Sequence, residues 1–217
     1  MVLPITLYSH PGGPNPWKVA LILEELGIPY ENKFLDFVQV KQEPFVSVNP
    51  NGRVPAIEDP NTGLTLWESG AIVLYLIEQY DTEHKISYTD FPNKYHTQQW
   101  LFFQATGQGP YYGQRVWFER YHPEKIQSAI DRYTNEGRRV ASVLESVLEK
   151  NDWLVGDKCT YADLSWLAWQ RRALSLFGED LYEKYPKVGA WIKRMEERPT
   201  VQKVYKDQDE AIAKTAH

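Results

Sequence analysis

The hydrophobic periodicity of the chain changes near residue 82, and this change constrains the fold more than any other feature of the sequence. Before it, short apolar segments rich in β-branched residues alternate with segments of helical period, whereas almost every later apolar segment is helical in period. The early order is strand, helix, strand, helix, strand, strand, helix. We therefore predict an α/β domain at residues 1–82, a polar linker at 83–93 and an all-helical domain at 94–217.

Turn and stop signals set the bounds of the early elements. Gly27 and Pro29 end the first helix, because glycine favours the left-handed C-cap conformation and proline cannot continue a helix. The segment PNTG joins two short strands into a hairpin. The predicted strands are residues 3–8, 30–37, 53–59 and 64–69. The predicted helices are residues 16–26 and a segment that starts at Ser69, and residues 43–49 are predicted as a short helix or a turn.

The later part of the chain contains no repeat of fixed period, and its helices are long. Glycine and proline residues between 107 and 110 loosen the first of them. Thr160 and Asp163 are spaced as a capping box, in which each side chain accepts from the other's backbone N–H. The predicted helices are residues 96–121, 123–150, 160–178 and 185–199.

Composition excludes several classes of function. The net charge of −5 argues against non-specific nucleic-acid binding, and no apolar run approaches the 18 residues of a membrane span. The N-terminus lacks the basic start and apolar stretch of a secretory signal. The single cysteine, Cys159, permits no internal disulfide and no cysteine-pair redox motif, and we expect it to be a small buried side chain. We expect a cytoplasmic protein without a metal, a membrane or a nucleic-acid partner.

The segment PGGPNP at residues 11–16 lies between the first strand and the first helix. Pro14 and Pro16 restrict the backbone on both sides of Asn15, which we expect at the N-cap. The start of a helix has unsatisfied N–H groups and the positive end of the helix dipole, and both attract an anion. The loop therefore either only starts the helix or also holds an anionic group there.

The segments WESGAI and RVPAIED suggest a site for a small peptide. Ser69 at a helix start can bind a carboxylate, and Glu68 beside it can bind an ammonium group. A plain serine cap with an exposed glutamate is the alternative. A cis Val54–Pro55 peptide would turn the backbone of Val54 outward to pair with an extended peptide, whereas a trans proline at a strand edge would not.

Together these segments resemble the glutathione transferase superfamily over nearly the whole chain. The motifs "VPA", "ESGAI" and "TYADL" carry the general resemblance, and the fungal nitrogen-regulator-like or Nu-class group is similar in "KVALILEELG", "FVSVNPNGRVPAI", "WLFFQ", "GQGPYYGQ" and "AIDRYTNEGRRV". The resemblance implies a thioredoxin-like N-terminal domain, an all-α C-terminal domain, glutathione as substrate and a homodimer.

The resemblance also implies roles for individual residues. Asn15 would stabilise the glutathione thiolate, and Gly13 stands where bacterial Nu members often have threonine. Arg132 would reach the glutathione of a partner subunit, with an ion pair inside its own helix as the alternative. The implied glutathione-binding residues are Asn15, Lys41, Gln42, Arg53, Val54, Pro55, Glu68, Ser69 and Arg132.

Aromatic residues in the second domain are candidates for the second substrate. An apolar site with a few polar groups would suit flat electrophiles, and core packing is the alternative for each residue. The candidates are Tyr111, Tyr112, Arg115, Trp117 and Phe118.

We therefore expect a detoxifying enzyme that conjugates glutathione to electrophiles or uses it to reduce disulfides or peroxides. The alternatives are a non-catalytic regulator of the same fold and a protein that binds hydrophobic ligands. Regulators of the group carry an asparagine-rich N-terminal extension, and this sequence starts directly at the first strand, which favours the enzyme.

Overall fold

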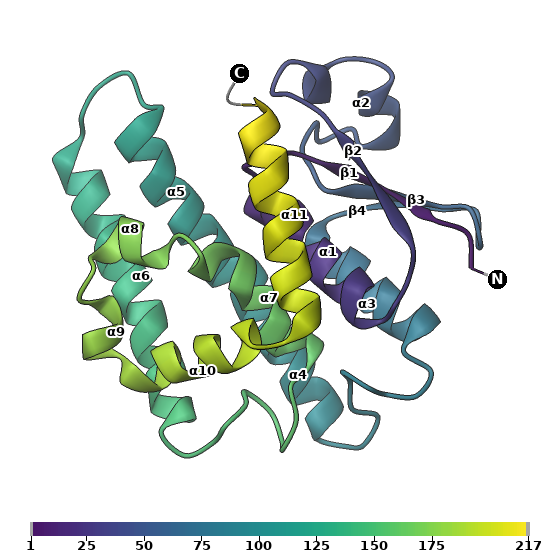
Figure 1. The fold of residues 1–217 in the computed structure, drawn as a ribbon. Helices are drawn as coiled ribbons and strands as arrows, with labels where there is room; N and C mark the ends of the chain where they lie inside the picture. Colours follow the sequence, from purple (N-terminus) through teal and green to yellow (C-terminus); the bar gives the residue numbers. More distant parts are fainter. Residues whose placement is uncertain (1, 216–217) are drawn as a thin grey trace. The chain divides into compact units, whose positions relative to one another are not determined.

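The computed structural model describes residues 2–215 and divides into two compact units (Figure 1). The first unit comprises the residues up to Ser87 together with those from Glu196 onward, and the second comprises Tyr88–Met195. The sequence placed the whole of 94–217 in the helical domain. The structure differs at the end of the chain, where the last segment belongs to the α/β unit.

The first unit is built on a four-stranded mixed sheet with the order β2-β1-β3-β4. Strand β1 pairs in parallel with β2 and antiparallel with β3, and β3 and β4 form the predicted hairpin. Central strands of this sheet are lined by side chains that are fully buried, which explains their apolar composition. The strands are β1 Ile5–Ser9, β2 Tyr30–Phe34, β3 Ala56–Asp59 and β4 Leu64–Trp67.

Helix α1 is central to the packing of this unit, since it contacts both α3 and α11. Figure 1 shows α11, in yellow, lying against α1. The sequence assigned no element beyond residue 199, but Pro199 is the first residue of α11, a position that favours proline. The helices of the unit are α1 Pro14–Glu25, α2 Phe45–Val48, α3 Ser69–Tyr80 and α11 Pro199–Thr215, and a 3₁₀ turn spans Gln39–Lys41.

A buried ion pair attaches the start of α11 to α1. Glu25 is 2% exposed and accepts from Arg198 through two bonds, Nε to Oε1 at 2.8 Å and Nη2 to Oε2 at 2.6 Å. Thr200 also donates to this carboxylate. Burial alone would raise the pKa of Glu25, but these donors lower it below its ordinary value. The bidentate pair fixes the start of the last helix against the end of α1.

The second unit is helical, as predicted, and the first of its predicted helices is interrupted. The segment 96–121 consists of two α-helices joined by a π-helical turn, Gln104–Gln108, next to the predicted glycine and proline residues. The helices are α4 Asn93–Phe103, α5 Gly109–Arg120, α6 Gln127–Leu148, α7 Tyr161–Gln170, α8 Ala173–Phe177, α9 Leu181–Lys184 and α10 Pro186–Glu196.

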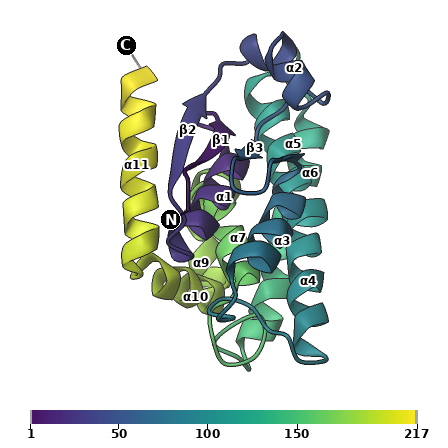
Figure 2. The same ribbon diagram turned by 90° about the vertical axis from the view of Figure 1, so that its right-hand side faces the viewer.

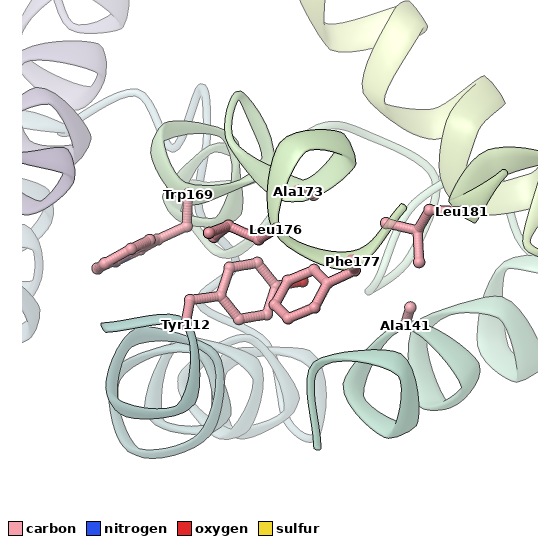
Figure 3. Packing of buried hydrophobic residues seen from close by; sticks show 7 residues of the cluster. All are labelled: Tyr112, Ala141, Trp169, Ala173, Leu176, Phe177 and Leu181. Carbon is pink, nitrogen blue, oxygen red and sulfur yellow. The ribbon is translucent and has the colours of Figure 1, made fainter. Parts of the chain in front are cut away.

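The core of the second unit contains an aromatic cluster (Figure 3). Tyr112 is fully buried, and its ring centroid lies 4.5 Å from that of Phe177. A Cβ on Gly137 would lie 2.2 Å from the Phe177 ring, so only glycine allows α6 to approach α8 this closely. The predicted capping box at the start of α7 is present, with Thr160 N–H donating to Asp163 at 2.8 Å.

Candidate functional site

A pocket of about 300 Å³ in the first unit brings together most of the residues predicted to bind glutathione. Its volume lies at the lower end of the range of about 300–1,000 Å³ that small-molecule sites occupy. Two asparagines that the sequence analysis did not single out complete its wall. The lining residues are Asn15, Asn49, Asn51, Arg53, Val54, Pro55, Glu68 and Ser69.

Asn15 lies in the first turn of α1 and not at its N-cap, which corrects the expectation. The helix begins at Pro14, and the N-cap is Gly13, without a side-chain capping bond. Proline is favoured at the first helical position, because its φ is already helical and its missing N–H has no acceptor there. Since Pro14 and Pro16 carry no amide proton, Asn15 contributes the single backbone N–H of this three-residue segment, together with its side-chain amide.

The loop before α1 is fixed by its own hydrogen bonds. Gly13 N–H donates to the carbonyl of His10 at 3.0 Å, and Gly12 N–H donates to His10 Nδ1 at 3.1 Å. The indole Nε1 of Trp17, whose side chain is buried, donates to the carbonyl of Pro11 at 2.9 Å. These contacts hold the loop in place and so fix where the first turn of α1 presents Asn15.

Two hydroxyl groups at the end of β1 are unsuited to stabilise a thiolate. The Tyr8 hydroxyl donates to Glu58 Oε2 at 2.8 Å, and burial, followed by this carboxylate, raises the pKa of Tyr8 to about 12. Ser9 is fully buried. The ring of Tyr8 packs on Phe45, which gives it a structural role. Asn15 is therefore the stronger candidate among the polar groups that follow the first strand.

Glu68 and Ser69 enter the pocket from the junction of β4 and α3. Helix α3 begins at Ser69, so its N-cap is Glu68, and the alternative of a serine cap at Ser69 does not apply. Glu68 has a φ of 72°, a left-handed conformation that is uncommon for residues with a Cβ. Such a conformation is retained where the surroundings require it, and it often marks a functional site. Here it places an exposed carboxylate beside the N-terminal turn of a helix.

The Val54 segment is shaped by Asn49, a residue that the sequence analysis missed. Asn49 is 2% exposed, and its Nδ2 donates to the carbonyl of Arg53 at 2.6 Å. Its Oδ1 accepts from Asn51 N–H at 2.9 Å. The peptide bond between Val54 and Pro55 is cis. The segment NPNGRVP carries a sequence signal that could have identified Asn49. Asn49 opens the turn-forming residues NPNG, which directly precede the Val54 segment.

A buried lysine lies on α1, close enough to Glu68 for the two groups to interact electrostatically. Lys18 is 1% exposed, and burial lowers its pKa to about 7, while the negative charge of Glu68 acts in the opposite direction. Lysine is almost never buried without a reason in the surrounding charges. The sequence analysis did not single out Lys18, because a lysine in an amphipathic helix is ordinarily exposed.

Three predicted glutathione-binding residues lie outside the lining of this pocket. Lys41 is exposed, and its Nζ donates to the carbonyl of Asn51 at 3.3 Å, which brings it next to the pocket wall. Gln42 and Arg132 are exposed, and Arg132 lies on α6 in the second unit. Their roles stay predictions.

The predicted second-substrate residues fall into two groups. Tyr112 and Arg115 lie in the interior of the second unit, where Arg115 donates to Thr134 Oγ1 at 2.8 Å and pairs with Glu119 at 3.0 Å. Their burial agrees with the alternative of core packing, and their contact with a second substrate stays a prediction. Trp117 is 48% exposed, and its contact with a substrate stays a prediction.

The other two candidates, Tyr111 and Phe118, are half-buried and flank Tyr133. Their ring centroids lie 6.4 Å and 5.8 Å from that of Tyr133. Their contact with the second substrate stays a prediction.

Residues 2–215 contain no group of three or more metal-ligating side chains arranged to hold an ion. Over the same residues, no helix combines the length and hydrophobicity that crossing a bilayer requires.

Two family descriptions match the chain. The glutathione S-transferase N-terminal domain matches residues 3–78, and the glutathione S-transferase C-terminal domain matches residues 112–208. A glutathione S-transferase-like protein, gedE of Aspergillus terreus, is 51% identical over 94% of this chain and 95% of its own length.

The chain is also similar to solved structures of glutathione transferases and of Ure2p. The glutathione transferase URE2P6 of Phanerochaete chrysosporium, in complex with oxidised glutathione, has a TM-score of 0.92 and 48% identity over 95% of this chain and 97% of its own. Ure2p in complex with glutathione has a TM-score of 0.88 and 40% identity over 94% of this chain and 99% of its own.

The thioredoxin-like unit, the helical unit and these matches define the chain as a member of the glutathione S-transferase family. Its relatives include fungal glutathione transferases and Ure2 proteins, so the predicted similarity to the nitrogen-regulator-like group is confirmed.

Proposed function

We propose that this chain is an enzyme that binds glutathione in the pocket lined by Asn15, Val54, Glu68 and Ser69 and activates its thiol. The observation that carries the proposal is the convergence of these residues, from three separate segments, on one pocket. An amide group, an exposed carboxylate and a helix start are the groups that a γ-glutamyl peptide with a thiolate would need.

Each segment matches one part of glutathione in this proposal. The start of α3 at Ser69 receives the α-carboxylate of the γ-glutamyl group, and Glu68 receives its ammonium group. The backbone of Val54 pairs with the cysteinyl residue, and the exposed Arg53 and Lys41 lie near the glycyl end. The thiol then lies toward Asn15.

Asn15 stabilises the thiolate through its amide. A thiol with a pKa of about 8.5 is mostly protonated at neutral pH, and stabilising the thiolate by about 2.7 kcal/mol would lower that pKa to about 6.5 and leave the thiol mostly ionised. The thiolate attacks an electrophilic carbon, a carbon–sulfur bond forms, and the leaving group departs with the bonding electrons. The same thiolate can attack a disulfide instead, releasing one thiolate as the leaving group.

The test is turnover of glutathione with 1-chloro-2,4-dinitrobenzene and, separately, with a small disulfide, beside a direct measurement of glutathione binding. Turnover with either substrate supports the enzyme. Binding without turnover favours the regulatory alternative, to which the 38% identical Protein URE2 of Saccharomyces bayanus draws attention. Absence of glutathione binding would contradict both and leave a role in binding hydrophobic ligands.

The proposal includes a two-fold dimer in which Arg132 reaches the glutathione of the partner subunit. Its support is the exposure of Arg132 on α6 and the family of the chain. Sedimentation at micromolar concentration should show a dimer. A monomer would remove the role of Arg132 and leave the pocket of the first unit untouched.

A further inference from the structure

Helix α11 runs along one side of the first unit and contacts α1 (Figure 2). Its buried residues, Val201, Val204, Gln208 and Ala211, are spaced as one face of a helix. Among these buried residues of α11 only Gln208 is polar, and it is 4% exposed. A glutamine on an otherwise apolar face is unusual, because a buried amide needs hydrogen-bond partners.

One partner of Gln208 is the backbone of the loop that precedes α1. Gln208 Nε2 donates to the carbonyl of Pro11, 197 positions away, at 3.5 Å. Trp17 Nε1 donates to the same carbonyl at 2.9 Å. A carbonyl oxygen has two lone pairs and can accept both bonds, of which the longer is the weaker. The Pro11 carbonyl therefore joins the loop to α1 and to α11 at once.

This carbonyl fixes the place of the loop, whereas other bonds fix its shape. The bonds from Gly12 and Gly13 to His10 lie within the loop and hold its turn. The bonds to Pro11 come from the two helices. Asn15 follows a few residues later with a proline on each side, and these prolines limit rotation of the backbone. A shift of the loop at Pro11 is therefore carried to Asn15.

Helix α11 is also held at the other end of α1. Arg198 bonds to Glu25, and Lys203 Nζ lies 3.0 Å from Glu24 Oε2. The start of α11 thus meets the end of α1, and Gln208 meets the loop before α1, so the two helices run antiparallel. Because α11 is anchored at the end of α1, Gln208 holds the loop from a fixed base.

We propose that Gln208 is a positioning residue that, through the Pro11 carbonyl, holds the loop so that Asn15 faces the thiol of glutathione. The inference rests on the proposed function, in which Asn15 stabilises the thiolate. Gln208 does not line the pocket that contains Asn15, so it acts through the loop. A donor aimed at a developing charge loses much of its effect when it is slightly displaced.

The experiment replaces Gln208 with methionine, which keeps the length of the side chain and removes the donor. The pKa of the bound glutathione thiol should rise by about 0.5–1 unit, and turnover at pH 6 should fall about three- to tenfold. The difference should largely disappear at pH 9, and the KM for glutathione should change less than about twofold. Gln202→Met, the same substitution at an exposed position of α11, is the matched control and should behave like the wild type.

The thiol titration separates positioning from a purely structural role. The melting temperature of Gln208→Met should stay close to that of the wild type, because the Pro11 carbonyl keeps its bond from Trp17. An unshifted thiol titration in Gln208→Met would overturn the inference, whether or not the melting temperature falls.

A measurement without glutathione distinguishes this inference from the proposed function. Amide hydrogen exchange of Gly12 and Gly13 reports local opening of the loop, and Gln208→Met should speed it several-fold. If the wild type binds glutathione but exchange and titration are unchanged in Gln208→Met, this inference alone fails. If the wild type does not bind glutathione, the proposed function fails and so does the role of Gln208 in the reaction, while faster exchange would still show that α11 holds the loop.

Discussion

Asn49 Nδ2 donates to the backbone carbonyl of Arg53 at 2.6 Å, across the turn that precedes the cis Val54–Pro55 bond. Because Asn49 also accepts from Asn51 N–H, one buried side chain fixes both ends of a segment that lines the pocket proposed to bind glutathione. The pocket therefore depends on a residue with a positioning role as well as on residues that face the ligand.

Replacing Asn49 with alanine should remove both hydrogen bonds and leave the carbonyl of Arg53 without this donor. We expect a loss of about 2–3 kcal/mol in the free energy of unfolding and a raised KM for glutathione. Urea unfolding and steady-state kinetics measure the two effects. Asn51→Ala, at an exposed position that keeps the Asn49–Arg53 bond, is the control and should change stability much less. Equal losses in both variants would contradict the positioning role.

Replacing Asn15 with alanine tests the activation of the thiol. Loss of a charge-assisted hydrogen bond of about 1.5–3 kcal/mol should raise the pKa of bound glutathione by roughly one to two pH units. Turnover at neutral pH should fall about ten- to a hundredfold and partly recover at alkaline pH. The thiolate absorbance of bound glutathione against pH gives the titration.

Because Asn15 lies inside the first turn of α1 and not at its N-cap, the same variant should lose little stability. A lowered melting temperature with an unshifted thiol titration would show that Asn15 serves only the helix.

Replacing Tyr8 with phenylalanine should leave the thiol titration where it is. The hydroxyl of Tyr8 is engaged with Glu58 and its pKa is raised to about 12, so it contributes nothing to the thiolate. We expect turnover close to that of the wild type and a loss of about 1 kcal/mol in stability from the missing hydrogen bond. A rise in the pKa of bound glutathione would instead assign Tyr8 a catalytic role.

Replacing Glu68 with glycine should separate stability from binding. Glycine adopts positive φ without strain, so the variant should gain about 1 kcal/mol in the free energy of unfolding. It also loses the carboxylate, and the affinity for glutathione should fall about ten- to a hundredfold. Ser69→Ala is expected to raise the KM for glutathione with little change in kcat. Glutathione affinity that is unchanged in both variants would refute the assignment of the γ-glutamyl site.

Replacing Lys18 with methionine should change how stability depends on pH. The pKa of Lys18 in the folded state, about 7, lies below its ordinary value of 10.5, so the unfolded chain binds more protons between these values. Stability from this residue therefore rises with pH across that window, by at most about 1.4 kcal/mol per pH unit.

The methionine variant should show a flatter profile between about pH 7 and pH 9, measured by urea unfolding. Lys203→Met, which removes a half-exposed lysine of α11, is the comparison and should keep the slope. If the slope were the same in Lys18→Met and in the wild type, the pKa of Lys18 in the folded protein would lie outside the range from pH 7 to its ordinary value.

Local rules in the sequence were enough to establish several parts of this protein. The order of strands and helices up to residue 80 follows from hydrophobic period and from glycine and proline stops. The capping box of Thr160 and Asp163 follows from the spacing of two residues. The motifs around Val54 and Glu68 identified the family, since a specific series of short segments is preserved in order.

Other features depend on contacts between distant segments and emerged only in three dimensions. The side chain of Asp163 also accepts from Leu154 N–H and Trp191, far outside the capping box. Helix α11 packs on the first unit through its buried residues Val201, Val204 and Ala211, and Arg198 bonds to Glu25, 173 positions away in the chain. The burial of Lys18 also depends on tertiary packing. Such pairings are set by packing and charge in the folded chain, and the local pattern of a sequence carries no direct record of them.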